Sequence, residues 1–363
     1  MSQDSDLIYQ YTEFILNNLP EWNHSKSEAD ISIITQKEKF AAETAKIDRT
    51  ADINSQLKQL GKIIKDSVPD NHICLFDTAK HQLVEKQNPS YSKFEYNLAY
   101  ASDNELKKYL LEEVKHFKMQ NGRPQWMIAT SKQNSQNIGI IAIPSFAGDV
   151  DCQATVRKQF TEHLITQKKQ HSWKDIIFDF RGNTGGDAEI IKEIGERLSG
   201  KPLLYADICE YVKNVPQNPE QNKIFSLKRF RRKTSPQYPS SDDDKFYGHL
   251  YILQDGWCAS ATEGAIYMLS QIANSTTVGE TTAGTFAGGG CVNIPFSYGT
   301  LRIGTEYRER SKNGHPIKEK EGIPADIPTS AKSAYHQALK MITSHTLPHE
   351  AILSEFIRKN KNL

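Results

Sequence analysis

The apolar residues at the start of this chain recur every three or four positions. Ile8, Tyr11 and Ile15 follow this spacing, and a second set runs from Leu57 to Val68. Because an α-helix has 3.6 residues per turn, side chains at this spacing share one helix face. The pattern therefore predicts helices up to about residue 66, the last of which ends at Pro69.

The middle of the chain has a different pattern, in which short apolar runs alternate with helical ones. The runs predict buried strands at Ile138–Ile143, Ile176–Phe180 and Leu250–Leu253. A helix is predicted from Asp187 to Leu198, with Gly200 as its stop signal. This alternation indicates an α/β fold, in which helices cover a sheet.

The length of 363 residues is sufficient for one large domain and a smaller one. The patterns divide the chain into four predicted segments. They are a mainly helical N-terminal region (1–90), a mixed connecting segment (91–135), an α/β core (136–330) and C-terminal helices (331–363). Short β-like pieces are also predicted inside the core segment, at 276–279, 291–295 and 301–304.

Charge and composition argue against several kinds of partner and location. The net charge of +1 provides no field for a polyanion, so nucleic acid is not an expected partner. No apolar run approaches the ~20 residues that span a bilayer. The first residues, MSQDSDLIYQYTEF, lack the basic and apolar regions of a secretion signal. We therefore expect a cytoplasmic protein, or a periplasmic or secreted one if a signal peptide had been removed.

The five cysteines are an odd number and form no C-x-x-C pair. A zinc site and a disulfide scaffold are therefore not expected. Cys258 lies two residues before a candidate nucleophile, Ser260, but we interpret it as a small packing residue. The chemistry suggested below needs no metal or organic cofactor.

Two motifs at strand-to-helix junctions carry the candidate chemistry. The first is FDFRGNTGG (178–186), and the second is DGWCASATE (255–263). Glycines leave backbone N–H groups open to a bound anion, and a serine at a helix start presents its hydroxyl. An oxyanion hole and a nucleophile are the two parts that acyl transfer requires. Local sequence alone also allows a plainer role for Ser260, because S-A-T-E is a helix capping box.

These motifs resemble those of peptidase family S41, which includes the tail-specific and tricorn core proteases. FDFRGNTGG is similar to the family signature D-x-R-x-N-x-G-G, and LYILQDGWCASATEGAIYML (250–269) is similar to its nucleophile segment. VGETTAG (278–284) and EGIPADI (321–327) resemble the two elements that follow, with Ala325 where proline is usual. The four occur in the family's order over roughly residues 136–330. The resemblance implies an S41 peptidase-like (ClpP/crotonase-like) catalytic core, here with a helical N-terminal region and no PDZ domain.

The resemblance also implies a base for the serine, and the sequence favours histidine over lysine. The tail-specific branch has a lysine directly after the G-x-x-T-x-G turn, where this chain has Thr285. The next lysine, Lys312, lies well beyond the turn. The tricorn branch uses a histidine from a short motif near its N-terminal helices, and His72 in VPDNHICL matches that position, although Asn71 replaces the family's serine.

In the tricorn-like branch, a glutamate just before the last motif completes the relay with the serine and the histidine. The residue three positions before Gly322 is Glu319. Glu321 is a rival, because it would face the same side of a strand. A solvated KEKE loop is the plainer interpretation of this segment. The resemblance therefore implies that Ser260 is the nucleophile, His72 the base and Glu319 the helper acid.

The backbone near Gly185, Gly186 and Ala261 is expected to hold the oxyanion. The predicted activity is that of a serine endopeptidase or carboxy-terminal processing peptidase acting on a peptide or unfolded protein. A homo-oligomer is possible. Two alternatives stay open: an S41-fold protein that only binds a hydrophobic ligand or peptide, and an esterase or amidase acting on small substrates.

Overall fold

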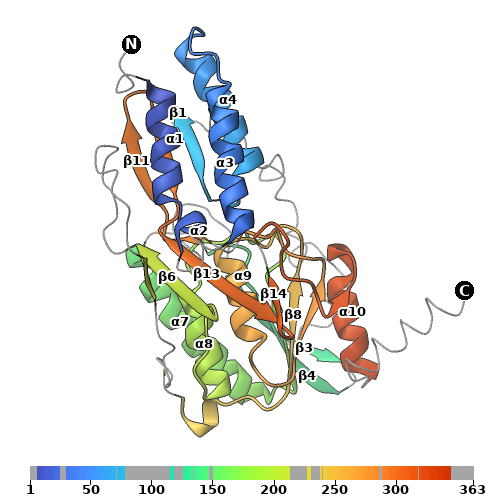
Figure 1. Cartoon of the computed structure of the whole chain (residues 1–363). Helices are drawn as coiled ribbons and strands as arrows, with labels where there is room; N and C mark the ends of the chain where they lie inside the picture. Colours follow the sequence, from blue (N-terminus) through green and yellow to red (C-terminus); the bar gives the residue numbers. More distant parts are fainter. Residues whose placement is uncertain are drawn as a thin grey trace, which may run out of the picture. The chain divides into compact units, whose positions relative to one another are not determined.

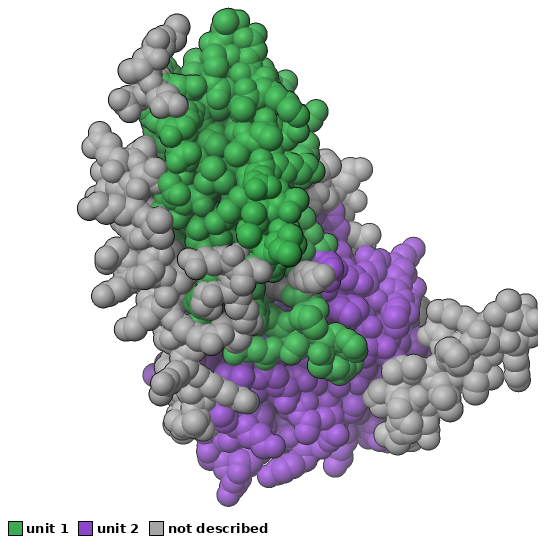
Figure 2. Space-filling model, viewed as in Figure 1, with its two compact units in different colours: residues 1–92, 206–232, 285–320 green, residues 93–205, 233–284, 321–363 purple. Residues whose placement is uncertain are grey.

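The structure is a computed structural model, and it describes residues 6–24, 30–70, 72–77, 115–117, 126–133, 135–146, 150–212, 227–229, 238, 240–285, 288–317 and 319–344. The chain forms two compact units, each assembled from three separate stretches. Unit 1 contains residues 1–92, 206–232 and 285–320, and unit 2 contains residues 93–205, 233–284 and 321–363 (Figure 2).

Unit 2 is built on a seven-stranded sheet with the strand order β15-β9-β8-β5-β4-β3-β2. Its strands are β2 (Lys115–Phe117), β3 (Trp126–Gln133), β4 (Gln136–Ala142), β5 (Asp175–Asp179), β8 (His249–Gln254), β9 (Ser275–Gly279) and β15 (Ile327–Pro328). The strands from β15 to β4 run parallel, whereas β3 and β2 are antiparallel to their neighbours. The α/β prediction is therefore confirmed, as are the three strands predicted in 138–253.

Helices connect the parallel strands, as the geometry of parallel pairing requires. They are α7 (Val150–His171) between β4 and β5, α8 (Glu189–Ser199) between β5 and β8, and α9 (Ala261–Leu269) between β8 and β9. Helix α8 ends as predicted: Gly200 caps it in the left-handed region (φ 66°) and its N–H donates to Glu196 O at 2.8 Å. A helix α10 (Ala331–Ser344) completes the unit.

Both faces of this sheet are covered, which explains the nearly continuous apolar runs of its strands. On one face, Ile140, Ile177, Tyr251 and Val278 pack in one core with Ala338 of α10. Helix α9 packs against β8 as well, and Figure 1 shows α9 and α10 on either side of that strand. The carboxyl ends of β5 and β8 lead directly into the two predicted motifs.

Unit 1 begins with the helices predicted from the N-terminal pattern. They are α1 (Leu7–Asn18), α2 (Pro20–Asn23), α3 (Ile31–Ala45) and α4 (Ile53–Ser67). Aspartates cap three of them, since Asp6, Asp30 and Asp52 each accept N–H groups of the first turn. In Figure 1, α1, α3 and α4 lie beside strands β1 and β11.

These helices share a core with a three-stranded antiparallel sheet of order β1-β12-β11. The strands are β1 (Cys74–Asp77), β11 (Val292–Phe296) and β12 (Gly299–Ile303). Tyr11 of α1 stacks on Phe296 of β11 with ring centroids 3.8 Å apart. The β-like pieces predicted at 291–295 and 301–304 are thus real strands, but they complete the core of the N-terminal helices and not that of the α/β sheet.

A second sheet in unit 1 has the order β10-β13-β6-β7, with β14 paired to β13. Its strands are β6 (Ile208–Val212), β7 (Leu227–Arg229), β10 (Gly288–Gly289), β13 (Glu306–Lys312) and β14 (His315–Ile317). Most of the predicted connecting segment 91–135 and everything after residue 344 lie outside the described residues. Within the described ranges, no helix has the length and apolar character needed to cross a bilayer.

Candidate active site

Ser260 occupies a strained turn between strand β8 and helix α9. Its backbone has φ 56° and ψ −120°, a conformation that residues other than glycine rarely adopt. Hydrolases of the α/β class hold their nucleophilic serine in a sharp turn of this kind, where the hydroxyl projects from the end of the sheet. Strain of this kind persists only where surrounding contacts fix it.

Glu263 supplies those contacts. It is fully buried, and its Oε2 accepts the Ser260 N–H at 3.0 Å in the capping-box arrangement. The other oxygen, Oε1, accepts the Thr282 hydroxyl at 2.5 Å and the Gly284 N–H at 2.9 Å. The capping box seen in the sequence is therefore present, and Glu263 uses it to join the serine turn to the G-x-x-T-x-G turn.

Gly185 lies directly against the serine turn. A Cβ added at this position would come within 2.9 Å of Ser260 Cβ and 2.8 Å of Ala259 O. The φ of +106° at Gly185 also excludes most side chains. The predicted oxyanion residues Gly185 and Ala261 are thus neighbours of Ser260, because the added Cβ would lie 3.1 Å from Ala261 N as well.

The N–H groups of the predicted oxyanion hole differ in their hydrogen bonding. The Gly185 N–H donates to Asn183 Oδ1 at 2.9 Å, so a side chain already uses it. Ala261 is the first residue of α9, where backbone N–H groups have no partner within the helix. Gly186 is exposed, with φ 129°. Among the described hydrogen bonds, none takes up the N–H of Gly186 or Ala261.

The polar residues of the first motif support the glycine loop. Arg181 forms a bidentate ion pair with Asp179, and the closest approach is 2.7 Å. The same guanidinium donates to Ala331 O at 2.6 Å, at the start of α10. Asn183 is fully buried, and its Nδ2 donates to Ile143 O at 2.8 Å. These bonds hold the loop in place.

Cys258 is a packing residue, as predicted, and not a nucleophile. Its side chain is fully buried and its thiol donates to Phe180 O at 3.1 Å. Burial raises the pKa of the thiol well above its ordinary value, and the nearby charge of Asp255 raises it further. A thiol with a raised pKa carries almost no thiolate at neutral pH.

The last two motifs bind each other and the nucleophile turn. The Ile323 N–H donates to Thr282 Oγ1 at 2.7 Å, and the Thr282 N–H donates to Ile323 O at 3.2 Å. Asp326 Oδ2 accepts both the N–H and the hydroxyl of Thr277, at 2.9 and 2.8 Å. The four motifs, recognised separately along the sequence, therefore form one connected network at one end of the sheet in unit 2.

The position that would hold the lysine of the tail-specific branch is Thr285, which is buried. Lys312 lies at the end of β13 in unit 1. The lysine turn of that branch is thus replaced here, as the sequence indicated. Asn71, which precedes the predicted base, lies outside the described residues.

His72 lies in unit 1 between α4 and β1, beside a buried carboxylate that the sequence analysis missed. Asp70 Oδ1 lies 3.1 Å from His72 Nδ1 and accepts the His72 N–H at 2.7 Å. The side chain of Asp70 is fully buried and that of His72 is 9% exposed. The D-x-H spacing is the signal that could have identified Asp70, because an Asp side chain commonly bonds the backbone N–H two residues on.

Glu319 also belongs to this cluster, whereas Glu321 does not. Ligand atoms of Asp70, His72 and Glu319 all lie within 4.8 Å of one another. Glu321 is exposed and belongs to unit 2. Of the two glutamates that the sequence left as rivals, the structure brings Glu319 to His72.

Electrostatics around His72 favour its protonated form. Burial by itself lowers the pKa of the imidazole, but the hydrogen bond and charge of Asp70 and the charge of Glu319 outweigh it, so the pKa lies above the ordinary 6.5. A further acid, Glu21 of α2, is buried in the same region. Burial and the charge of Asp70 raise the pKa of Glu21 well above its ordinary value.

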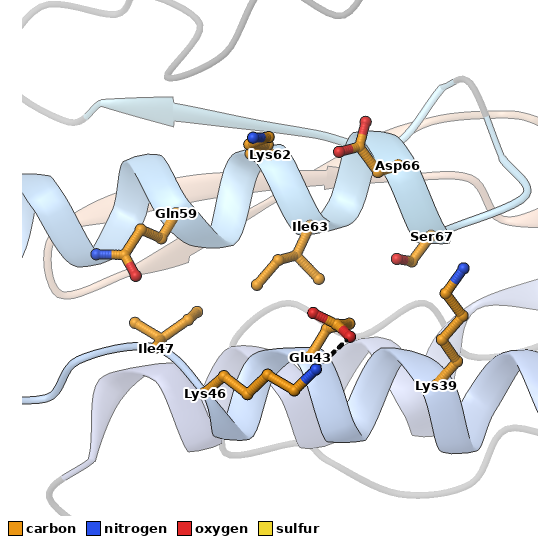
Figure 3. Close-up of a pocket in the computed structure, with 9 residues that line it drawn as sticks. All are labelled: Lys39, Glu43, Lys46, Ile47, Gln59, Lys62, Ile63, Asp66 and Ser67. Atoms are coloured by element: carbon orange, nitrogen blue, oxygen red, sulfur yellow. Dashed lines mark hydrogen bonds and ion pairs between the residues drawn. The ribbon is translucent and has the colours of Figure 1, made fainter.

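A separate hollow lies between α3 and α4 of unit 1, with a volume of about 440 Å³ (Figure 3). None of the predicted catalytic residues lines it. Its lining includes both lysines and acidic residues. Lys46 forms an ion pair with Glu43 at 2.6 Å on an exposed surface. This mixture of charges is typical of a solvated groove.

Comparison with known proteins identifies the family to which this chain is similar. The model of peptidase family S41 matches residues 137–329, which is more than half of the chain. A search of the curated proteins gives no significant match.

Several solved structures share the fold. A candidate peptidase from Parabacteroides merdae has a TM-score of 0.57 at 15% identity, over 89% of each chain. Mature CPAF has a TM-score of 0.55 at 11% identity, over 93% of this chain and 96% of that one. The complex of CPAF with lactacystin gives 0.52 at 10%, over 96% and 98%. At these identities the likeness shows the fold alone. The family match over the motif-bearing segment goes further: the chain belongs to peptidase family S41, a family of serine peptidases that act on peptides or proteins.

Proposed function

We propose that this chain is a serine endopeptidase or carboxy-terminal processing peptidase of the Ser-His type. Ser260 is the nucleophile, His72 is the general base, and acidic side chains beside His72 stabilise its protonated form. The observation that carries the proposal is the backbone of Ser260, whose positive φ is maintained by Glu263 and by the close packing of Gly185. A helix cap alone would not require that conformation.

In the proposed reaction, the Ser260 hydroxyl attacks the carbonyl carbon of the scissile peptide bond while its proton passes to His72 Nε2. The carbonyl oxygen becomes an oxyanion, which the N–H groups of Ala261 and Gly186 stabilise. Gly185 contributes by its close approach, since its own N–H is bonded to Asn183. His72 then gives the proton to the departing amine as the C–N bond breaks. Water next attacks the acyl carbon while His72 takes its proton, and His72 returns that proton to the Ser260 oxygen as the acid product leaves.

Asp70 and Glu319 have different parts in this proposal. Asp70 accepts the Nδ1–H of His72, which leaves the Nε2 lone pair available for the serine proton. Glu319 adds a second negative charge that favours the imidazolium. The sequence had implied Glu319 as the single helper acid.

A peptide or unfolded tail is the proposed substrate, because an extended chain can pair with a strand edge while its carbonyl reaches the serine. A fluorophosphonate probe tests the nucleophile directly. We expect mass spectrometry to find the label on Ser260 of the wild type and none on the Ser260→Ala protein. Ser270, at the other end of α9, bonds Ile266 O at 2.7 Å, so Ser270→Ala is the matched control and should label normally.

A second candidate is a protein of this fold that binds a peptide or hydrophobic ligand without hydrolysing it. Two observations favour it: the Gly185 N–H is already bonded, and Thr285 stands where one branch of the family has a lysine. Absence of labelling at Ser260, together with saturable peptide binding, would support this candidate. Faster turnover of short esters than of peptides would instead indicate an esterase.

A further inference from the structure

The cluster around His72 contains more buried carboxyl groups than a catalytic relay needs. Asp70 is 2% exposed, and its Oδ2 has no hydrogen-bond partner among the described residues. Glu21 is 5% exposed, and both of its carboxylate oxygens are likewise without a partner among the residues described. The charges of Asp70 and Glu319 both act on Glu21. Buried carboxylates without partners destabilise the fold unless they take up a proton or a cation.

The geometry of the cluster suits a small metal ion. Zn²⁺ binds nitrogen and oxygen ligands at about 2.0–2.1 Å, which sets the ligand-to-ligand distance in a tetrahedral site at roughly 3.3 Å. The distance from His72 Nδ1 to Asp70 Oδ1 is 3.1 Å, so one edge of the tetrahedron is already formed. A carboxylate oxygen of Glu319 lies within 4.8 Å of the ligand atoms of His72 and Asp70. To reach the tetrahedral ligand-to-ligand distance, this oxygen needs to move by about 1.5 Å at most.

The donor set indicates which metal would bind. One imidazole and two carboxylates form a mixed nitrogen and oxygen site of borderline softness, which suits Zn²⁺ and its neighbours. Ca²⁺ and Mg²⁺ prefer sites made entirely of oxygen. Three protein ligands leave a fourth position for water or for the carboxylate of Glu21.

We propose that Asp70, His72 and Glu319 bind one divalent transition-metal ion, with Zn²⁺ as the best fit, and that the bound ion switches off the peptidase. The second half rests on the proposed function. The metal takes the Nδ1 lone pair of His72, which requires the single proton of the neutral ring to move from Nδ1 to Nε2 through solvent. With its proton on Nε2, this nitrogen has no lone pair with which to accept the proton of Ser260.

Binding is tested first, on the full chain carrying Ser260→Ala so that no catalysis is involved. Zn²⁺ affinity is measured by competition with a chromophoric chelator, and Co²⁺ is used to read the coordination from its visible absorption. We expect one site whose affinity falls at least about tenfold in Asp70→Asn and in Glu319→Gln. Glu321→Gln is the matched control, because Glu321 is exposed and outside the cluster, and its affinity should not change.

Far-UV circular dichroism and the melting temperature show whether each variant folds. Glu319 is half-buried in a turn, so Glu319→Gln keeps the test available if Asp70→Asn unfolds. The proposal is overturned if the Ser260→Ala chain binds no Zn²⁺ at micromolar concentration. It is equally overturned if Asp70→Asn and Glu319→Gln bind as tightly as their parent, because surface histidines would then account for the binding.

Inhibition is tested next, on the chain with Ser260 intact. We expect Zn²⁺ to stop turnover reversibly, with full recovery after a chelator is added, and the Glu321→Gln protein to respond like the wild type. Zn²⁺ that binds the cluster but leaves turnover unchanged would overturn the regulatory half. If the chain hydrolyses no peptide even without metal, the proposed function fails, and the binding result on the Ser260→Ala chain still decides the metal site.

Discussion

Asp70 holds His72 at two points: its Oδ1 accepts the His72 backbone N–H at 2.7 Å and lies 3.1 Å from His72 Nδ1. One carboxylate oxygen therefore fixes both the turn that leads into β1 and the orientation of the imidazole ring. Because Asp70 is fully buried, its charge is weakly screened and acts strongly on His72. This contact makes the charge state of His72 depend on Asp70.

Asp70→Asn should shift the pH dependence of turnover. His72 can accept a proton only when it is neutral, so activity should rise with pH through a pKa above 6.5. Without the charge of Asp70 the effect of burial dominates, and the rise should move to lower pH. Turnover at the plateau should also fall by about 10²-fold or more, because the imidazolium loses its stabilising charge. Rates measured between about pH 5 and 9 provide the test, and an unshifted profile would contradict it.

The raised pKa of His72 also has a consequence for stability. A group whose pKa is higher in the folded protein stabilises the fold fully below its unfolded value of about 6.5, and this contribution is lost as the pH rises through the folded value. We therefore expect the difference in unfolding free energy between the wild type and His72→Gln to shrink as the pH rises from about 6 to 9. Urea denaturation at fixed pH intervals measures it. A difference independent of pH would mean that the pKa of His72 is unshifted.

Glu319→Gln should lower turnover more than Glu321→Gln does, with little change in substrate affinity. Glu319 lies within reach of the His72 ring and carries a charge that acts on it, whereas Glu321 is exposed. A carboxylate beside the base stabilises the charge formed in the transition state and not the bound ground state. We expect kcat to fall by up to about 10²-fold for Glu319→Gln, with KM almost unchanged. Small and equal effects in both variants would leave Asp70 as the sole acid of the relay.

The α/β sheet and its motifs could be predicted because their signals are local. Strands buried on both faces read as apolar runs, as in Ile176–Phe178, and the turns after β5 and β8 need glycine and serine for steric reasons. The capping box of Ser260 and Glu263 was also visible in four consecutive residues. In each case residues adjacent in the sequence determine the conformation, so it can be predicted from the sequence alone.

Features that depend on tertiary contacts were missed or assigned differently. The strands at 292–303 resemble those of the α/β core but complete the core of the N-terminal helices, because only the packed structure shows which apolar face meets which. Glu21 lies in a helix of four residues, and nothing local indicates that it is buried. The motif does not indicate that Asn183 Oδ1 accepts the Gly185 N–H, because that bond depends on the folded loop.

Gly185→Ala should reduce both stability and turnover, because Gly185 has a positive φ and is packed against Ser260. The added Cβ would lie 2.9 Å from Ser260 Cβ and 2.8 Å from Ala259 O. Gly314 is the matched control, since its φ of +78° is also positive but a Cβ there meets nothing within 4 Å. Gly314→Ala should therefore cost only the backbone strain, about 1–2 kcal/mol. Gly185→Ala should cost more and lower kcat by about 10²-fold, as small displacements of a nucleophile do.

Glu263→Gln should destabilise the serine turn. Each carboxylate oxygen of Glu263 accepts hydrogen bonds from donors, Oε2 from Ser260 N and Oε1 from Thr282 and Gly284. An amide has only one acceptor oxygen, so its NH₂ group would face one of these donors in the fully buried site. We expect a loss of about 1–3 kcal/mol in unfolding free energy, measured by urea denaturation, together with reduced turnover. Glu321→Gln changes the same groups on an exposed side chain and should leave stability within about 0.5 kcal/mol of the wild type.

Ser260→Ala should abolish hydrolysis and leave the fold intact. The bond from Ser260 N to Glu263 Oε2 involves only the backbone of residue 260, so alanine retains it. Loss of the serine side chain from the cap should cost about 1 kcal/mol at most, whereas loss of a nucleophile costs on the order of 10⁴–10⁶ in rate. Turnover of an unfolded protein substrate and the melting temperature, measured on the same preparation, separate the two effects. Ser270→Ala should keep full activity because its hydroxyl lies at the other end of α9. Near-normal turnover of the Ser260→Ala protein with a lowered melting temperature would mean that Ser260 only caps the helix.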